Sequence, residues 1–270
     1  MKMNRIRWIP LMVLVIFMTA ALQQVIKERS QASILEKDLL VSLPFRAQDL
    51  DEILFQDIRA QERAGGNFGE ILTVSMLQGN FSPGKILCDP SVYLRYKPKK
   101  FRILKKAYEA VWSDVQYFPV AARENFFEDT FGSSRNYGGN RIHEGTDIFG
   151  KKQISGYYPV ISMTDGTVEK TGWLPLGGYR IGIRAPHGGY YYYAHLSGYE
   201  KEFVTGETLR AGDILGYMGN TGYGKEGTTG KFPVHLHLGI YIPVSDSGDI
   251  SVNPYRILRA FHKNIINYAL

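Results

Sequence analysis

The strongest constraint on the fold is a change in sequence character near residue 118. Before it, apolar residues recur at helical spacing, and the clearest set is Phe101, Leu104, Tyr108, Val111 and Trp112. After it, glycines become frequent, and short β-prone runs such as "YRIGIRAP", "GYYYYAHL" and "DILGYMGNTG" alternate with turn signals. Strands and helices do not alternate in this part. The pattern predicts a mainly β domain with antiparallel sheets over 118–270, preceded by a helical region over 27–117.

Two shorter segments give local expectations. The stretch "YPVISMTDGTVEKTGW" contains two β-prone runs around Asp165 and Gly166, which predicts a β-hairpin at that pair. In the helical region, a second set of apolar residues at helical spacing predicts another helix: Leu50, Ile53, Leu54 and Ile58. No motif in the helical region indicates its role.

The N-terminus has the pattern of an export signal. Three basic residues, Lys2, Arg5 and Arg7, precede a mostly apolar run from Trp8 to Leu22. Fifteen residues are short for a full membrane span, which needs about 20, but Val25 and Ile26 could extend the run. We expect residues 1–26 to be a retained membrane anchor or a cleaved signal peptide, and a buried core helix is the third alternative. Either export reading places the rest outside the cytoplasm, on the outer face of the membrane or in the cell wall.

Composition excludes several function classes. The net charge of +6 favours anionic partners, such as anionic lipid or acidic wall polymers. A basic cluster precedes and enters one predicted helix, where it is either a solvated face or a contact to an anionic surface: Lys97, Lys99, Lys100, Arg102, Lys105 and Lys106. No dense arginine block or basic-aromatic motif points to nucleic acid, so we expect no nucleic-acid partner. The single cysteine, Cys88, excludes an internal disulfide and is expected to be a small buried hydrophobe. Neither a phosphate loop nor a serine nucleophile elbow is present.

Histidines carry the main chemical signal. Five of the six fall in the strand-rich part: His143, His187, His195, His235 and His237. In "FPVHLHLGIY", His235 and His237 project to one face of a strand, while Val234, Leu236 and Leu238 face the core. These two imidazoles are either two ligands of one metal, a ligand and a base, or core histidines. In "RIHEGTDIFG", His143 and Asp147 lie four residues apart where a loop enters a strand, so they can meet on one ion.

Four motifs in order resemble one family. "HEGTDIFG", "YYAHLS", "GDILGYMGNTG" and "HLHLGIY" are similar to segments of the lysostaphin-type (LytM-type) zinc endopeptidases, which cleave peptide bonds in bacterial peptidoglycan. The resemblance covers about residues 130–243 and implies a lysostaphin-like peptidase fold with a groove. Carried over by position, it implies Zn²⁺ ligands at His143, Asp147 and His237. It also implies non-ligand active-site histidines at His195 and His235, and a tyrosine at Tyr137 that stabilises the oxyanion.

The resemblance leads to a specific expectation and one alternative. A zinc held by two imidazoles and one carboxylate keeps a position for water, whereas a second ligand from the His-x-His pair would close the site. We therefore expect a zinc endopeptidase that hydrolyses peptidoglycan peptides, with His195 or His235 as the general base. The alternative is a non-hydrolytic zinc-binding scaffold or an activator of other wall enzymes. Val234 before the His-x-His pair and the long loop "TGYGKEGTTGKF" depart from the family pattern and border the groove. Which peptidoglycan bond is cut stays open.

Overall fold

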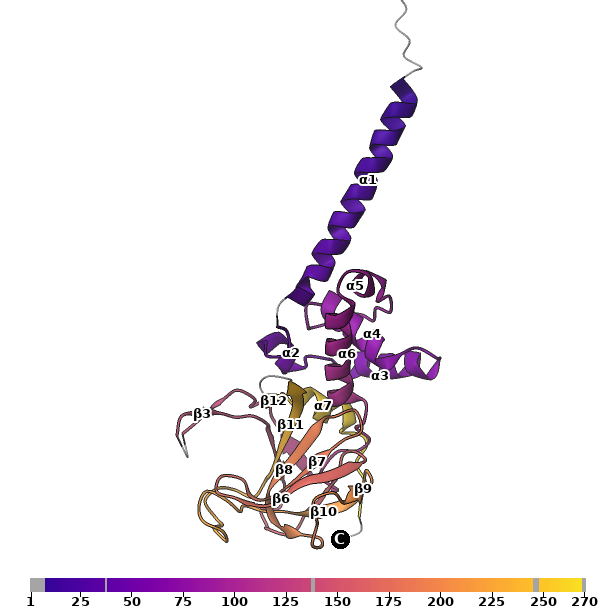
Figure 1. The fold of residues 1–270 in the computed structure, drawn as a ribbon. Coiled ribbons are helices and arrows are strands. Elements are labelled where there is room, and N and C mark those ends of the chain that lie inside the picture. The colour runs from indigo at the N-terminus through magenta and orange to yellow at the C-terminus, as the bar shows by residue number, and fades with distance from the viewer. Residues whose placement is uncertain (1–7, 37, 137–138, 245–247, 269–270) are drawn as a thin grey trace, which may run out of the picture.

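A computed structural model describes residues 8–36, 38–136, 139–244 and 248–268 of the chain. A long N-terminal helix projects from a group of shorter helices, and these helices lie between it and a β domain (Figure 1). The order along the chain is therefore apolar helix, helical region and sheet, as the change near residue 118 predicts.

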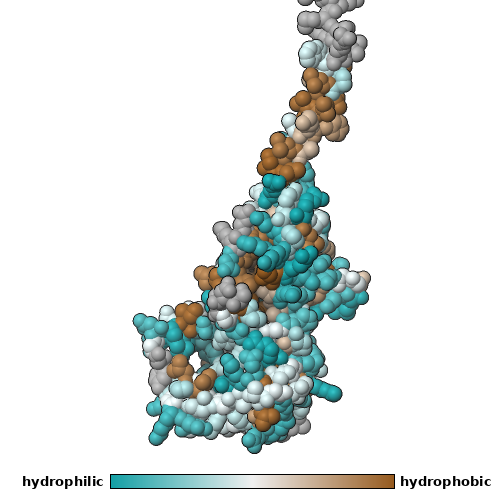
Figure 2. Space-filling view, viewed as in Figure 1, coloured by the Kyte–Doolittle hydropathy of each residue, from teal (hydrophilic) through white to brown (hydrophobic). Residues whose placement is uncertain are grey.

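The projecting helix α1 (Ile9–Ala32) continues into a 3-10 turn over Ser33–Glu36. Its 24 residues span about 36 Å, which exceeds the roughly 30 Å thickness of a bilayer core. By length and composition Ile9–Leu35 is apolar enough to cross a membrane, and its most apolar window has no residue buried against the rest of the protein. Figure 2 shows these apolar side chains standing clear of the folded part. The alternative of a buried core helix is therefore wrong.

Five helices follow, and local caps explain where several of them begin. They are α2 (Leu43–Ala47), α3 (Glu52–Arg63), α4 (Phe68–Gln78), α5 (Ser91–Tyr96) and α6 (Pro98–Trp112). Side chains of Ser42, Asp51 and Asn67 accept backbone N–H groups in the first turns of α2, α3 and α4. Helix α6 begins at a proline, which lacks the N–H that a first turn would leave unpaired.

The helical region differs from the prediction at two residues, Ile53 and Cys88. All five periodic residues of α6 are buried, whereas Ile53 of α3 is 73% exposed and Phe55 takes its place in the core. Cys88 is exposed, so the expectation of a buried cysteine is wrong. It lies in the extended segment between α4 and α5, where no helix or strand carries it into the core.

The helical region and the sheet share one hydrophobic core. Helix α6 packs against strand β11 (Leu236–Val244). The buried Tyr191 hydroxyl of strand β8 (Tyr190–Tyr199) donates to the carbonyl of Val111 at 2.8 Å. The C-terminal helix α7 (Tyr255–Phe261) packs on α3, where the rings of Phe55 and Phe261 lie 5.2 Å apart. Because this packing crosses the division near residue 117, the helical region supports the sheet directly.

The sheet is antiparallel throughout the described chain. Its main path runs β1-β4-β11-β8-β7-β6-β9, with β10 paired to β5 and β8, and β12 paired to β11. The bounds are β1 (Asn125–Phe127), β4 (Thr146–Gly150), β5 (Pro159–Ile161), β6 (Gly166–Leu174), β7 (Gly178–Arg184), β8 (Tyr190–Tyr199), β9 (Thr208–Leu209), β10 (Ile214–Met218), β11 (Leu236–Val244) and β12 (Gly248–Val252). A separate hairpin of β2 (Ser134–Arg135) and β3 (Arg141–Ile142) projects to one side (Figure 1). The mainly antiparallel β domain is confirmed.

The hairpin predicted at Asp165 and Gly166 is wrong. Strand β5 pairs with β10, and the hairpin partner of β6 is β7, which follows it in the chain. All three residues of β5 are buried, whereas β6 is mostly half-exposed, so the two strands belong to different environments. The Asp165 carboxylate accepts the N–H of Ala211 at 2.8 Å, which ties this turn to the segment before β10.

Candidate active site

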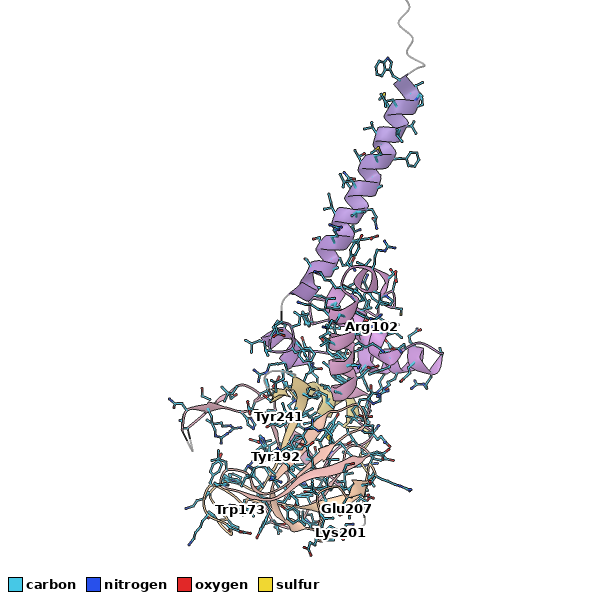
Figure 3. The ribbon with its side chains drawn as sticks, viewed as in Figure 1. Arg102, Trp173, Tyr192, Lys201, Glu207 and Tyr241 are labelled. Atoms are coloured by element: carbon cyan, nitrogen blue, oxygen red, sulfur yellow. The ribbon has the colours of Figure 1, made fainter. Side chains whose placement is uncertain are left out.

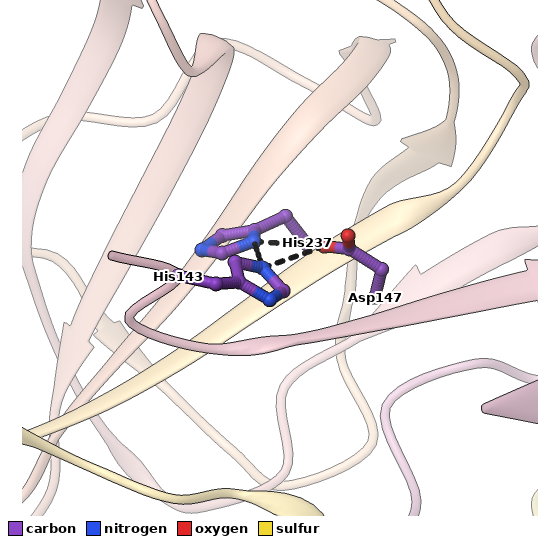
Figure 4. A group of neighbouring side chains, drawn as sticks. All are labelled: His143, Asp147 and His237. Carbon is purple, nitrogen blue, oxygen red and sulfur yellow. Dashed lines mark hydrogen bonds and ion pairs between the residues drawn. The ribbon is translucent and has the colours of Figure 1, made fainter. Parts of the chain in front are cut away.

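The two central strands of the site are neighbours, and their register sets its geometry. Strand β11 pairs with β4 so that His237 lies directly opposite Asp147. On β11, Leu236 and Leu238 are fully buried in the core, and the alternation therefore turns His237 to the other face. His143 is held just before β4, in the segment that follows β3. Three residues from two sequence motifs thus meet on one face of the sheet (Figure 4).

The donor atoms of these three side chains converge. His143 Nε2 is 3.1 Å from Asp147 Oδ1 and 3.0 Å from His237 Nδ1, and His237 Nδ1 is 2.9 Å from Asp147 Oδ1. Zinc bonds of about 2.0–2.1 Å at tetrahedral angles separate ligand atoms by about 3.3 Å, close to these values. Two imidazoles and one carboxylate are also a donor set that zinc accepts. The residues present therefore fit a zinc ion.

Neighbouring groups hold the carboxylate in its charged form. Burial alone would raise the pKa of Asp147, but hydrogen bonds from His143 and His237 outweigh it and keep that pKa well below its usual range. Arg135, on the projecting hairpin, lies 2.8 Å from Asp147 Oδ2. Burial lowers the pKa of His143, which favours the neutral imidazole that a metal requires.

Two residues that are not metal-ligand candidates, Thr130 and Arg135, orient the ring of His143. Its Nδ1 lies 3.2 Å from the carbonyl oxygen and 3.0 Å from the hydroxyl of Thr130, and 2.8 Å from Arg135. Contacts at the far ring nitrogen fix the orientation of a metal-binding histidine. Neither Thr130 nor Arg135 belongs to a recognisable motif, and sequence reasoning missed both for that reason.

His195 reaches the site through a distortion of strand β8. Alternation along β8 places Tyr191 and Tyr193 in the core and Ala194 at the cleft, so a regular strand would turn His195 away from the cleft. Instead His195 has a φ of 64°, and the pairing of β8 with β7 shifts between Tyr179 and Ile181. This bulge turns His195 into the cleft, a strained conformation of the kind found at functional sites.

Carbonyl groups fix both remaining histidines. His195 Nδ1 is 2.8 Å from the carbonyl oxygen of Thr221, and His235 Nδ1 is 2.8 Å from that of Pro233. A carbonyl only accepts, so each Nδ1 carries the proton and each Nε2 keeps a lone pair. Burial lowers the pKa of His235 and, more strongly, that of His195, which favours the neutral ring. The two rings lie 4.8 Å apart, and His235 Nε2 is 3.6 Å from Asp147 Oδ1.

All five side chains line one cavity of about 1190 Å³. Its walls include Phe149 of β4 and Phe232 of the long loop, whose rings lie 5.2 and 5.1 Å from the ring of His235. Tyr192 and Tyr241 also line it, from neighbouring strands (Figure 3). The loop that departs from the family pattern therefore supplies part of the wall, as expected from its position.

Three other residues near these motifs are not part of the group of five. Tyr137 lies outside the described residues. His187 occupies the turn between β7 and β8, where its Nδ1 is 2.7 Å from Asp114 Oδ1. Glu144 follows His143 and also lines the cavity, but its carboxylate accepts from Ser251 Oγ at 3.4 Å. The described cluster of metal-type donors consists of His143, Asp147 and His237.

The sequence of this chain is similar to those of known peptidases. The domain of Peptidase family M23 matches residues 141–254. The L-Ala–D-Glu endopeptidase of Bacillus subtilis (strain 168) is 42% identical over 167 residues, which are 61% of this chain and 49% of that protein. This chain therefore spans about half the length of its curated relative.

A solved structure is similar to most of this chain. A crystal structure from Ruminococcus gnavus ATCC 29149, provisionally described as the glycyl-glycine endopeptidase LytM, is 40% identical, with a TM-score of 0.75 over 88% of this chain and 98% of that one. The catalytic domain of the antimicrobial peptidase lysostaphin from Staphylococcus simulans is 27% identical, over 50% of this chain and 92% of that one, with a TM-score of 0.38. The fold and the site define a β-sheet peptidase of the LytM type. Within that class, this chain belongs to peptidase family M23.

Proposed function

We propose that this protein is a zinc-dependent endopeptidase that hydrolyses peptide bonds in bacterial peptidoglycan. The observation that carries the proposal is the convergence of His143, Asp147 and His237 in one cavity with two further histidines, His195 and His235. Family membership supports the same reaction, and the Bacillus subtilis relative is named for cleaving a peptide bond between L-Ala and D-Glu.

Each residue has a separate task in this proposal. His143, Asp147 and His237 hold the zinc, and Arg135 and Thr130 orient two of these ligands. When bound, zinc lowers the pKa of a water to about 7 and polarises the scissile carbonyl. The Nε2 lone pairs of His195 and His235 take up the proton of the attacking water and later protonate the leaving amine. Phe149 and Phe232 restrict bulk water around the ring of His235.

The N-terminal part determines where the enzyme acts. We propose that residues 1–26 anchor the protein in the membrane or direct its export, which places residues 118–270 outside the cytoplasm as the peptidase domain. Residues 27–117 pack on the sheet through α6, so in this proposal they hold the peptidase domain next to the anchor. Membrane lipid and peptidoglycan peptides are then its partners, and nucleic acid is not.

The test is digestion of purified cell wall by the full chain in detergent. Zinc-loaded wild type releases soluble fragments, and mass spectrometry of the products identifies the bond that is cut. Asp147→Asn keeps the shape of the side chain and loses its charge, so we expect it to lose both zinc and digestion. His187→Gln, changed in a turn outside the donor cluster, is the matched control. A zinc-loaded wild type that left walls of several chemistries intact would overturn the proposal.

A further inference from the structure

Positive charge is concentrated in one segment of the chain, over residues 80–106. This segment carries eight basic residues and one acidic residue, which is a net charge of +7. The whole chain has a net charge of +6, so the rest of it has a net charge of −1. The basic character of the protein therefore belongs to α5, α6 and the residues before them. The eight residues are Lys85, Arg95, Lys97, Lys99, Lys100, Arg102, Lys105 and Lys106.

Helix α5 is fixed to α1 close to the point where the apolar part of α1 ends. Arg95 Nη1 donates to Glu28 Oε2 at 2.8 Å, and the Tyr96 hydroxyl donates to the same oxygen at 3.1 Å. The side-chain amide of Gln31 donates to the Tyr93 hydroxyl at 3.4 Å. In Figure 1, α5 accordingly lies beside the end of α1 that joins the folded part. The basic segment is thus tied to the projecting helix by side chains of both helices.

These contacts set the height of the basic segment relative to a membrane. Ile26 is the last residue of the apolar run, and the next three residues, Lys27, Glu28 and Arg29, are all charged. Glu28 lies about 3 Å beyond Ile26 along the helix axis. The headgroup layer on each side of a bilayer is about 5–7 Å thick. Arg95, which pairs with Glu28, is therefore at the level of the headgroups when α1 spans the membrane.

The first turns of α6 continue this surface, because only Lys97 separates α6 from α5. Lys99, Arg102 and Lys106 are spaced three or four residues apart, so they share one face of the helix with Ile103. The three cations are exposed, and Ile103 is 46% exposed among them. Cations attract acidic headgroups, and an apolar side chain between them can enter the headgroup boundary. The face has the chemistry of a lipid contact.

We propose that this basic surface, formed by Arg95, Lys99, Arg102 and Lys106, binds anionic phospholipid headgroups of the membrane that α1 enters. The rest of the chain has no positive excess that would draw its other faces to the same lipids. The β domain is therefore held away from the bilayer. Acidic wall polymers carry the same kind of charge, but they would not explain why the cations lie beside the end of the anchor. This inference rests on the proposed retention of α1 and is independent of the peptidase chemistry.

The experiment measures which lipid gathers around the helical region of the full chain in nanodiscs. Cys88, the single cysteine, is exposed three residues before α5, so it can carry a fluorophore without any substitution. Phosphatidylcholine discs contain a small fraction of either phosphatidylglycerol or phosphatidylcholine with the same nitroxide on its acyl chain. We expect quenching to show at least about tenfold enrichment of phosphatidylglycerol, because each basic residue near the surface contributes about fivefold. Raising the salt from about 0.15 M to about 1 M should remove most of this enrichment.

Charge variants test whether the basic surface is responsible. Lys99→Gln with Arg102→Gln should lower the enrichment by about tenfold or more, and Arg95 is left unchanged because it also holds α5 to α1. Lys99→Arg with Arg102→Lys keeps the charges and should keep the enrichment. The matched control, Lys151→Gln with Lys201→Gln, removes two exposed charges from the β domain and should keep it too. Figure 3 shows Arg102 in the helical region and Lys201 at the far end of the molecule from α1.

The outcomes separate this inference from the other proposals. Equal quenching by the two lipids in wild type would overturn the lipid surface and leave the anchor and the peptidase standing. A chain that does not stay in the discs would overturn the anchor and the lipid surface together. Wall digestion in detergent involves no membrane, so it tests the peptidase separately. Binding of a soluble acidic wall polymer by wild type but not by the glutamine double variant, without lipid enrichment, would assign the surface to the wall instead.

Discussion

His237 and Asp147 lie directly opposite each other across strands β11 and β4, with Nδ1 and Oδ1 2.9 Å apart. This cross-strand pair combines the second histidine of one motif with the carboxylate of another, 90 residues away in the chain. Because both strands are braced by buried residues on the opposite face, the pair is held in place before any metal binds.

The two histidines of the His-x-His pair should differ when each is replaced. We expect His237→Ala to lose zinc and activity together, because it removes one of three ligands. His235→Ala should keep about one zinc per chain and lose about 10²- to 10⁴-fold in kcat, the usual contribution of a proton-transfer group. Metal analysis and kinetics on the same samples provide the check. Equal zinc loss in both variants would show that the pair acts as two ligands.

The backbone at His195 should limit what can replace it. Asparagine tolerates a positive φ, whereas a β-branched residue does not. We expect His195→Asn to fold nearly as stably as wild type and His195→Val to be less stable by about 1–3 kcal/mol, with turnover reduced in both. Urea unfolding of the two variants gives the comparison. If valine were as well tolerated as asparagine, the bulge would not store strain.

Acid should destabilise the fold partly through His262, which does not line the active-site cavity. Burial lowers the pKa of this ring, and its Nε2 donates to Asn125 at 3.0 Å. Below the unfolded pKa of about 6.5 the unfolded chain binds more protons, so the free energy of unfolding falls as the pH drops from 7 toward 5.

We expect His262→Gln to reduce that fall, by at most about 1.4 kcal/mol per pH unit. Unfolding midpoints at several pH values measure it, and Lys263→Gln, an exposed neighbour, is the control. An unchanged pH profile would mean that the protonated ring is accommodated in the fold.

Membrane fractionation should show whether helix α1 is retained as an anchor or cleaved as a signal. If residues 1–26 are a retained anchor, the intact mass matches the full chain and the protein stays in the membrane fraction after carbonate washing. Replacing Leu14 and Phe17, both exposed in the apolar helix, by arginine should reduce membrane insertion, because each charge costs about 2.5–3.5 kcal/mol at the centre of a span. A shorter mature mass and a soluble product would instead identify a cleaved signal.

Much of the site could be anticipated from the chain. His143, Asp147, His195, His235 and His237 stand in recognisable motifs, and the structure brings all five to one cavity. The periods of 3.6 and 2 likewise predicted the buried residues of α6 and the two faces of β11, because those patterns are local. Local turn signals were less dependable: Asp165 and Gly166 form a turn without a hairpin, since strand pairing depends on distant partners.

The sequence by itself determined the antiparallel β domain, the preceding helices, the apolar N-terminus and the residue types of the site, since each depends on short-range pattern or motif. Only the tertiary structure decided that His237 faces Asp147 and that the bulge at Ala194 and His195 turns a histidine into the cleft. Those relationships depend on register between strands, and register is set by the packing of the whole sheet.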